Sequence, residues 1–441
     1  MIVDGFILVL IASCLALGGL LVALCSARYY RLALFLVAIS PIASTIFMPN
    51  PSVDMEMEAE VGFGSYLRIG MLLLCGTAGT ILFLRAKPRN GVPLHLVLLG
   101  VFVLIALAST AYSIDPRTTF IRAASSAAVF SFLLGLHCWL KDPERLHGVM
   151  ETLFLSILLV LALNVFAAVF LPDKAWLYPD MSRFQGLLDQ PNVMGSFCML
   201  SYPVLLWKHA RGTAAEKWIV VCVGCVMVFL HLMTGSRGSL VTAAILTSVW
   251  FLTLRQWTRL IAFVSLVGVV ALLAVTLLAS KFERIETDDA TGLNGRPEFW
   301  QASLELLMER PLLGYGYAVE GKVWEDPRFN KPGYFLWSGS AKTSLHNGYL
   351  SVAIGGGLIA LVLWCALLGI PLSRSLLSPG NEYRAFAISV IVASLLRNFI
   401  ESEIQPTGAA TGILFWVAWV IAGHDILQKL PEPEELKKRM V

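Results

Sequence analysis

Residues 148–171 read GVMETLFLSILLVLALNVFAAVFL, and this stretch decides the fold class. Glu151 is the one ionisable side chain within it. A helix needs roughly 20 mostly apolar residues to cross the hydrocarbon core of a bilayer, and this stretch is long enough. We therefore expect a membrane-spanning helix here.

Similar apolar stretches follow one another along the chain, separated by short polar connections. They predict an all-α polytopic membrane protein with about 12–13 transmembrane helices, because one early stretch could be interfacial. The stretch 3–25 is too long for the apolar region of a signal peptide, so we expect it to be retained. The expected spans are 3–25, 31–48, 65–84, 93–112, 118–138, 148–171, 192–207, 217–233, 236–254, 258–280, 346–371, 383–400 and 408–425.

The composition disfavours other classes of protein. Hydrophobic residues make up 57% of the chain and charged residues 14%, with a mean hydropathy of +0.73, which is too apolar for a soluble domain of 441 residues. The formal net charge of +3 is small and spread over short loops, so nucleic-acid binding is disfavoured. All eight cysteines lie in or beside expected spans, which indicates no disulfide framework. We interpret the C-x-x-C of Cys222 and Cys225 as small packing residues.

The distribution of basic residues predicts the orientation and the division of the chain. Lysine and arginine gather in alternate connections, which the positive-inside bias places in the cytoplasm. Two long connections, 172–191 and 281–345, then face outward. We divide the chain into an amino-terminal helix bundle (1–280), a large outward loop with short helices of its own (281–345), and carboxy-terminal helices with a cytoplasmic tail (346–441).

The short connection 234–239 (TGSRGS) joins two expected spans and holds Arg237 at the membrane rim. Ser236 is placed to cap the helix that follows. The glycines beside the Ser-Arg pair leave room for a phosphate group to approach the backbone and the guanidinium. The alternative is an interfacial arginine that simply extends its charge into water.

A second arginine, Arg296, lies in the first turn of a helix predicted to start near Asn294. Unpaired backbone N–H groups and the helix dipole favour an anion there, and a guanidinium adds two parallel donors for phosphate oxygens. Apolar residues at helical spacing, including Trp300 and Leu304, predict an amphipathic helix along the membrane surface that ends before Pro311. The alternative is an arginine that contacts only solvent or lipid headgroups.

His346 begins the span that follows the large loop, with Thr343 or Ser344 expected to cap the helix. A neutral histidine at the bilayer edge can take a proton from a sugar hydroxyl, which is what a general base in glycosyl transfer requires. A capping or interfacial histidine is the alternative.

Other polar residues near outward helix ends are candidates for substrate contacts, or for caps and ion pairs. Those that enter a helix from the shorter outward loop are Arg183, Gln190 and Asn192. Those at the ends of spans are Arg122, Arg397 and Glu401, for which a structural ion pair is expected.

Taken together, three motifs resemble those of the O-antigen ligase and O-antigen polymerase superfamily. They are residues 236–238 (SRG), residues 295–300 (GRPEFW) and residues 346–350 (HNGYL), and their order, spacing and common outward face all fit. The similarity is strongest over residues 180–355, whereas the amino-terminal spans match only in hydropathy.

The resemblance implies an enzyme that transfers a glycan from undecaprenyl diphosphate to an acceptor at a periplasmic active site, without a metal ion or cofactor. Carried over by motif, Arg237 and Arg296 would bind the donor diphosphate, and His346 would deprotonate the acceptor hydroxyl. A single displacement would invert the sugar carbon. Asn347 and Tyr349, together with the outward polar residues named above, would be possible substrate contacts.

Members of the superfamily differ chiefly in their acceptor. The moderate length of the loop 281–345 favours a ligase that acts on lipid A-core during lipopolysaccharide assembly in the inner membrane of a Gram-negative bacterium. An O-antigen polymerase or a protein O-oligosaccharyltransferase is the alternative within the superfamily. A multi-span transporter of an anionic substrate is the alternative of another class, and it predicts essential polar groups near the midplane on broken helices.

Overall fold

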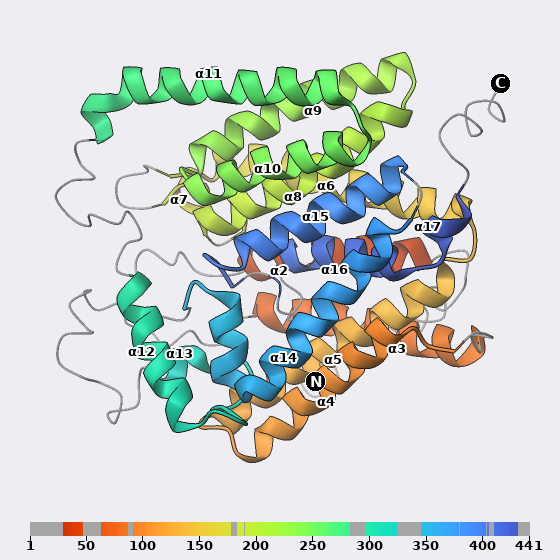
Figure 1. Ribbon diagram of the computed structural model, residues 1–441, viewed down its shortest axis with the longest axis vertical. Coiled ribbons are helices and arrows are strands. Elements are labelled where there is room, and N and C mark those ends of the chain that lie inside the picture. Colours follow the sequence, from red (N-terminus) through yellow and green to blue (C-terminus); the bar gives the residue numbers. More distant parts are fainter. Residues whose placement is uncertain are drawn as a thin grey trace, which may run out of the picture.

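The protein is a bundle of α-helices (Figure 1). The computed structural model describes residues 30–46, 63–86, 91–177, 183–188, 190–282, 296–323, 345–378, 380–402, 404 and 410–430. Each expected span from 31–48 onward corresponds to a helix, whereas the expected span 3–25 lies outside the described residues. The helices are α2 (Tyr30–Ile46), α3 (Phe63–Ala86), α4 (Leu94–Ala108), the 3-10 turn η1 (Ser109–Ala111), α5 (Pro116–Trp139), α6 (Pro143–Phe170), α7 (Pro172–Ala175), α8 (Pro191–Arg211), α9 (Ala214–Met233), α10 (Arg237–Thr253), α11 (Trp257–Phe282), α12 (Arg296–Glu309), α13 (Glu320–Val323), α14 (Gly348–Leu376), α15 (Glu382–Arg397), α16 (Ala410–Gly423) and α17 (Ile426–Lys429).

The helices differ in how well they suit lipid. In the part of the chain that the structure describes, six are long and apolar enough to cross a membrane: most of α3, α4 together with η1, α5, α6, α9 and α14. Shorter apolar stretches are Tyr30–Ile42 in α2, Arg237–Thr253 in α10, Trp257–Val270 in α11 and Gly412–Gly423 in α16. α8 and α15 are more polar, and they lie inside the bundle, where protein rather than lipid surrounds them (Figure 1). Polar side chains are tolerated at such interior positions.

α14 is divided by a break that the sequence analysis did not predict. Gly357 has φ 67° and ψ −170°, a conformation that is essentially restricted to glycine. The backbone of residues 311–316 fills the break: the Tyr315 N–H donates to the Ile354 carbonyl at 2.8 Å, and the Leu358 N–H donates to the Pro311 carbonyl at 2.8 Å. The polar groups freed by the break therefore bond to protein, as apolar surroundings require.

The first part of α14 and the outward segment before it share a small hydrophobic core. Leu306 and Leu307 of α12 pack with Tyr315 and Ile354, separately from the core of the main bundle. α12 also exposes Met308, so an apolar side chain lies on its outer face as well. The expected helix after Asn294 is confirmed, with bounds Arg296–Glu309, while its placement on a membrane surface stays a prediction.

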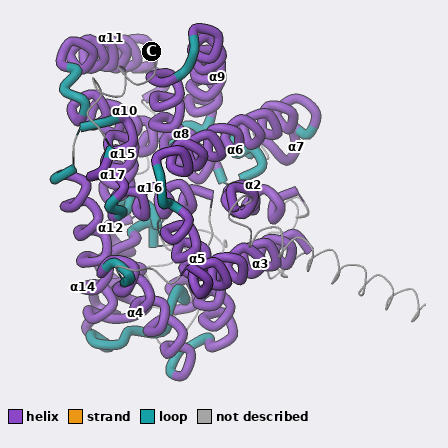
Figure 2. Tube along the Cα trace, turned by 90° about the vertical axis from the view of Figure 1, so that its right-hand side faces the viewer, coloured by secondary structure: helices purple, strands orange, loops and turns teal. Residues whose placement is uncertain are grey.

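The connections expected to face outward lie together. α7, α12 and α13 are at one end of the bundle and α17 is at the other (Figure 1). The view in Figure 2, turned by 90°, shows α3 and α5 side by side, with α2 between this pair and α6. We call the end that holds α7, α12 and α13 the α12 end. The turn between α9 and α10 and the start of α14 are also at the α12 end, so the predicted site residues are at one end of the fold.

Candidate functional site

The turn between α9 and α10 is built around Gly235, whose φ of +60° suits glycine. The Thr234 hydroxyl donates to the His231 carbonyl at 2.7 Å and accepts from the Ser236 N–H at 3.1 Å. Ser236 occupies the cap position of α10, but its side chain makes no capping hydrogen bond, so the expected role of its hydroxyl is wrong. Arg237 is the first residue of α10 and is exposed.

Arg183 binds the back of this turn. The Phe184 N–H donates to the Met233 carbonyl at 2.8 Å, which holds the 183–188 loop against the end of α9. Arg183 Nε donates to the Thr234 carbonyl at 2.8 Å and Nη2 donates to Asn192 Oδ1 at 3.0 Å. Burial lowers the pKa of Arg183 from its ordinary value, Glu401 opposes this and Arg237 adds to it. The guanidinium remains charged, because an arginine pKa lies far above neutrality.

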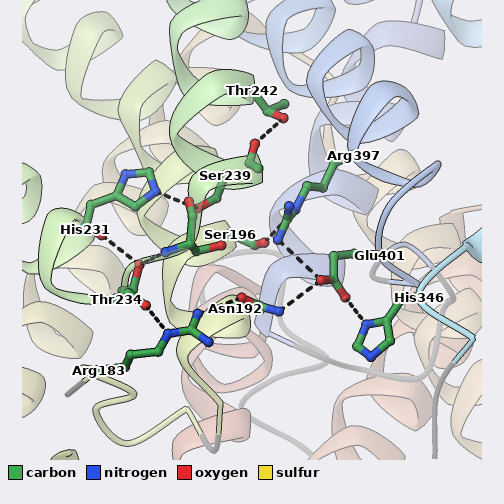
Figure 3. Close-up of polar contacts among 12 residues, drawn as sticks. Arg183, Asn192, Ser196, His231, Thr234, Ser239, Thr242, His346, Arg397 and Glu401 are labelled. Carbon is green, nitrogen blue, oxygen red and sulfur yellow. Dashed lines mark hydrogen bonds and ion pairs between the residues drawn. The ribbon is translucent and has the colours of Figure 1, made fainter. Parts of the chain in front are cut away.

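Asn192 links Arg183 to a carboxylate from the other end of the sequence. Its Nδ2 donates to Glu401 Oε1 at 3.0 Å, and the second oxygen of Glu401 lies 2.8 Å from His346 Nδ1 (Figure 3). A continuous chain of polar contacts therefore joins His346, Glu401, Asn192, Arg183 and the turn before Arg237. Four segments far apart in the sequence meet there.

The carboxylate determines which nitrogen of His346 carries the hydrogen. Glu401 has 8% of its side chain exposed and His346 has 39% exposed. An ionised carboxylate only accepts hydrogen bonds, so His346 Nδ1 carries a hydrogen, and in the neutral imidazole the lone pair is on Nε2. This is the arrangement of a histidine prepared to take a proton at Nε2.

The backbone at His346 is strained and well supported. Its φ of +49° is in the left-handed region, which non-glycine residues seldom adopt. Asn347 caps α14, with Oδ1 accepting from the N–H groups of Tyr349 at 3.1 Å and Leu350 at 3.0 Å. The expected cap at Thr343 or Ser344 is therefore wrong. Strain of about 1–3 kcal/mol persists only where surrounding contacts enforce it, and it is often found at functional sites.

Arg397 lies behind the carboxylate and is almost fully buried. Its Nε donates to Ser196 Oγ at 3.3 Å, and its Nη2 lies 3.8 Å from Glu401 Oε1 (Figure 3). The expected ion pair of Arg397 with Glu401 is thus confirmed. A Cβ at Gly238 would collide with the Arg397 guanidinium. The space beside Gly238 is therefore filled by a buried arginine of the protein, which corrects our expectation that this glycine leaves room for phosphate.

The remaining predicted residues lie around this centre. Arg122 donates to the Ala318 carbonyl. Tyr349 is anchored through its hydroxyl to the Leu395 carbonyl at 3.0 Å. Gln190 precedes α8 without capping it and is exposed, and Arg296 is the first residue of α12, with its side chain outside the described part.

No metal site is evident in the described ranges, since no three His, Cys, Asp or Glu side chains are placed to hold an ion. Cys222 and Cys225 are exposed on α9, so our interpretation of them as packing residues is wrong.

The pairing of Glu401 with His346 and the contact of Ser196 with Arg397 were not predicted from the sequence. Glu401 follows Arg397 by four residues, which signals their own ion pair. Nothing in the local sequence indicates that the end of α15 meets the start of α14, where the Gly348 N–H donates to the Asn398 carbonyl at 2.8 Å. That contact is a property of the tertiary fold.

The chain is similar to known proteins over the part that holds all three of the predicted motifs. A family model described as "O-Antigen ligase" matches residues 221–365. An "O-antigen ligase" of Salmonella typhimurium is 24% identical over 245 residues, which cover 50% of this chain and 58% of that protein. An "O-antigen ligase" of Pseudomonas aeruginosa is 29% identical over 181 residues, covering 38% of this chain and 40% of that protein. The chain thus matches about half the length of these relatives, and the findings confirm its resemblance to the O-antigen ligase superfamily.

Proposed function

We propose, from this similarity to the O-antigen ligase superfamily, that the protein is an inverting glycosyltransferase that needs no metal ion. It would transfer O-antigen polysaccharide from undecaprenyl diphosphate to lipid A-core at the periplasmic face of a bacterial inner membrane. The family supplies the reaction class, and the positive-inside distribution of basic residues supports the periplasmic placement of the α12 end.

The observation that carries the proposal is the pairing of His346 Nδ1 with Glu401 Oε2 at 2.8 Å. With Nδ1–H bonded to the carboxylate, His346 Nε2 accepts the proton of the acceptor hydroxyl while that oxygen attacks the anomeric carbon. The carbon–oxygen bond to the diphosphate breaks, its electron pair stays on the diphosphate, and attack from the opposite face inverts the carbon. The buried Glu401 carboxylate stabilises the imidazolium that forms.

The two arginines take up the negative charge of the leaving group. Arg237 stands exposed at the first turn of α10, and Arg296 occupies the same position of α12. Guanidinium groups and helix amino termini both bind phosphate oxygens, and their attraction strengthens as charge develops on the departing diphosphate. Arg183 is committed to the Thr234 carbonyl and to Asn192, so it holds the turn in place.

The alternatives predict different products. A polymerase would use the same residues on a second lipid-linked glycan, and a protein O-oligosaccharyltransferase would use them on a protein hydroxyl. A transporter requires polar groups on broken helices near the midplane. α14 is broken, but residues 311–316 fill the break with backbone bonds, and the polar chain from His346 to Arg183 lies at helix ends. These features favour the enzyme.

The test supplies purified protein with O-antigen on undecaprenyl diphosphate and lipid A-core, with a chelator present, and follows capped lipid on a gel. Wild type and His209→Ala, which alters an exposed histidine at the other end of α8, should form product. His346→Ala should be inactive, because a general base contributes about 10²–10⁴-fold to the rate. Inhibition by the chelator would contradict metal independence.

The other products separate the alternatives. A longer donor glycan would indicate a polymerase, and glycan attached to a supplied protein would indicate an oligosaccharyltransferase. Failure of transfer to every acceptor, with uptake of an anionic substrate into vesicles, would indicate a transporter.

A further inference from the structure

Behind the turn that presents Arg237 lies a second chain of hydrogen bonds that the proposed reaction does not use. It runs from Tyr202 of α8 through His231 of α9 to Ser239 of α10, and ends at the backbone of Ser236. His231 and Ser239 have no exposed surface, and Ser236 is 3% exposed. Figure 3 shows His231 and Ser239 on the side of the turn opposite Arg183.

The direction of every bond in this chain is determined by its last member. Ser239 Oγ lies 2.8 Å from the Ser236 carbonyl oxygen, which only accepts, so the Ser239 hydroxyl hydrogen points there. Ser239 Oγ must then accept from His231 Nε2, 2.8 Å away, and this nitrogen carries the hydrogen. In the neutral imidazole, the lone pair on His231 Nδ1 then accepts from the Tyr202 hydroxyl at 3.1 Å. Each donor meets one acceptor, with a neutral imidazole in the middle.

The hydrogen bonds from Tyr202 to Ser236 hold the turn on one side, and Arg183 holds it on the other. Arg183 Nε binds the Thr234 carbonyl at 2.8 Å, and Ser239 binds the Ser236 carbonyl at 2.8 Å. The carbonyls before and after Gly235 are thus both bonded. Gly235 would otherwise leave the turn mobile, because glycine constrains the backbone least.

We infer that Tyr202, His231 and Ser239 are positioning residues that fix the turn before Arg237, and so set the affinity of the protein for the diphosphate of its donor. The inference rests on the proposed function, since it assigns Arg237 to that diphosphate. It goes beyond the proposed function by giving a role to residues on three helices behind the turn, which the proposed reaction does not use.

The test measures binding of undecaprenyl diphosphate to the purified full chain in detergent, together with the donor KM and kcat. His231→Phe keeps an aromatic ring but removes both hydrogen bonds, and it should weaken binding and raise the donor KM about tenfold. His231→Gln restores an N–H near the Nε2 position and should return binding to within about threefold of wild type. Tyr202→Phe removes one hydroxyl and should give an intermediate loss of affinity. This variant replaces His231→Phe in the test if His231→Phe does not fold.

Combining His231→Phe with Arg237→Ala in one protein distinguishes a positioning role of His231 from a general loss of structure. If His231 acts through Arg237, His231→Phe should change binding less than about twofold once Arg237 is absent. A matched control, His95→Phe, alters a buried histidine that packs against Gly423 and Trp419, and should bind the lipid as wild type does.

Each other outcome contradicts a specific statement. Unchanged binding in His231→Phe, while Arg237→Ala binds poorly, overturns the positioning role and leaves the proposed function intact. Equal weakening by His231→Phe with and without Arg237 also overturns it. Wild-type binding by Arg237→Ala overturns the assignment of Arg237 to the diphosphate, and the positioning role with it.

Discussion

Replacing Glu401 should slow the reaction without weakening substrate binding. The perturbation removes the negative charge from the 2.8 Å contact to His346 Nδ1, a contact that fixes the tautomer and stabilises the imidazolium formed in the transition state. Hydrogen bonds to charged groups are worth about 1.5–3 kcal/mol, and each 1.4 kcal/mol is about tenfold in rate. Glu401→Gln should therefore lower kcat roughly 10- to 100-fold with little change in KM, as expected for an interaction that strengthens in the transition state.

A glutamine at position 401 also accepts fewer hydrogen bonds from its neighbours than the glutamate does. The two oxygens of Glu401 accept from His346 and Asn192, so the amide NH₂ of a glutamine must face one of these donors. It also removes the negative charge 3.8 Å from the buried Arg397, and breaking such a pair costs about 3–5 kcal/mol of stability. Glu401→Asp separates the two effects, because it keeps the charge near Arg397 but withdraws the carboxylate from His346.

The assay is initial-rate glycan transfer with varied donor and acceptor, alongside thermal unfolding of each variant. Glu401→Asp should unfold near the wild-type temperature and still show the loss of kcat. Glu382→Ala, which removes a carboxylate at the other end of α15, paired with Arg211 at 3.4 Å, is the matched control and should retain wild-type kcat. Wild-type kcat in both Glu401 variants, with His346→Ala inactive, would refute the reasoning.

Three further outcomes are expected. Gly357→Ala should destabilise the protein by about 1–3 kcal/mol, because φ is +67° and a Cβ there would collide with the Leu312 carbonyl; a thermal midpoint equal to wild type would contradict this. Burial raises the pKa of Glu320, so stability should be greatest below the ordinary carboxyl pKa and fall as pH rises through the raised value; unfolding measured across pH should lose this slope in Glu320→Gln. Arg183→Lys should lower donor affinity about tenfold, because an ammonium cannot reach both the Thr234 carbonyl and Asn192 in the planar geometry of a guanidinium, and lipid-binding titration would measure it.

Much of the helical architecture could be predicted because hydropathy is a local property. In a bilayer, a single apolar stretch such as 148–171 satisfies its backbone hydrogen bonds by forming a helix, and here it forms most of the long helix α6 (Pro143–Phe170). The break at Gly357 was not predictable in this way. The surrounding apolar run continues on both sides of it, and the backbone that fills it, residues 311–316, comes from another segment.

The site was predictable in its charged residues but not in its connections. Arg237 and His346 stand out because a charge or an imidazole is costly at the end of an apolar run. Asn192 and Glu401 also mark helix ends, but the contact between them joins residues 209 positions apart. Which helix ends meet depends on packing of the whole bundle. Our expectation for Gly238 failed for the same reason, since Arg397 arrives from α15 to fill the space.

The contact of Asn192 with Glu401 also has a consequence for synthesis of the protein. Asn192 and Ser196 leave the ribosome with α8, long before α15 brings the carboxylate and the guanidinium they bond in the finished fold. The nascent chain therefore passes through a stage in which α8 carries polar side chains into the membrane rim ahead of their partners. Insertion of α15 then completes both the burial of these groups and the support of His346, the proposed base.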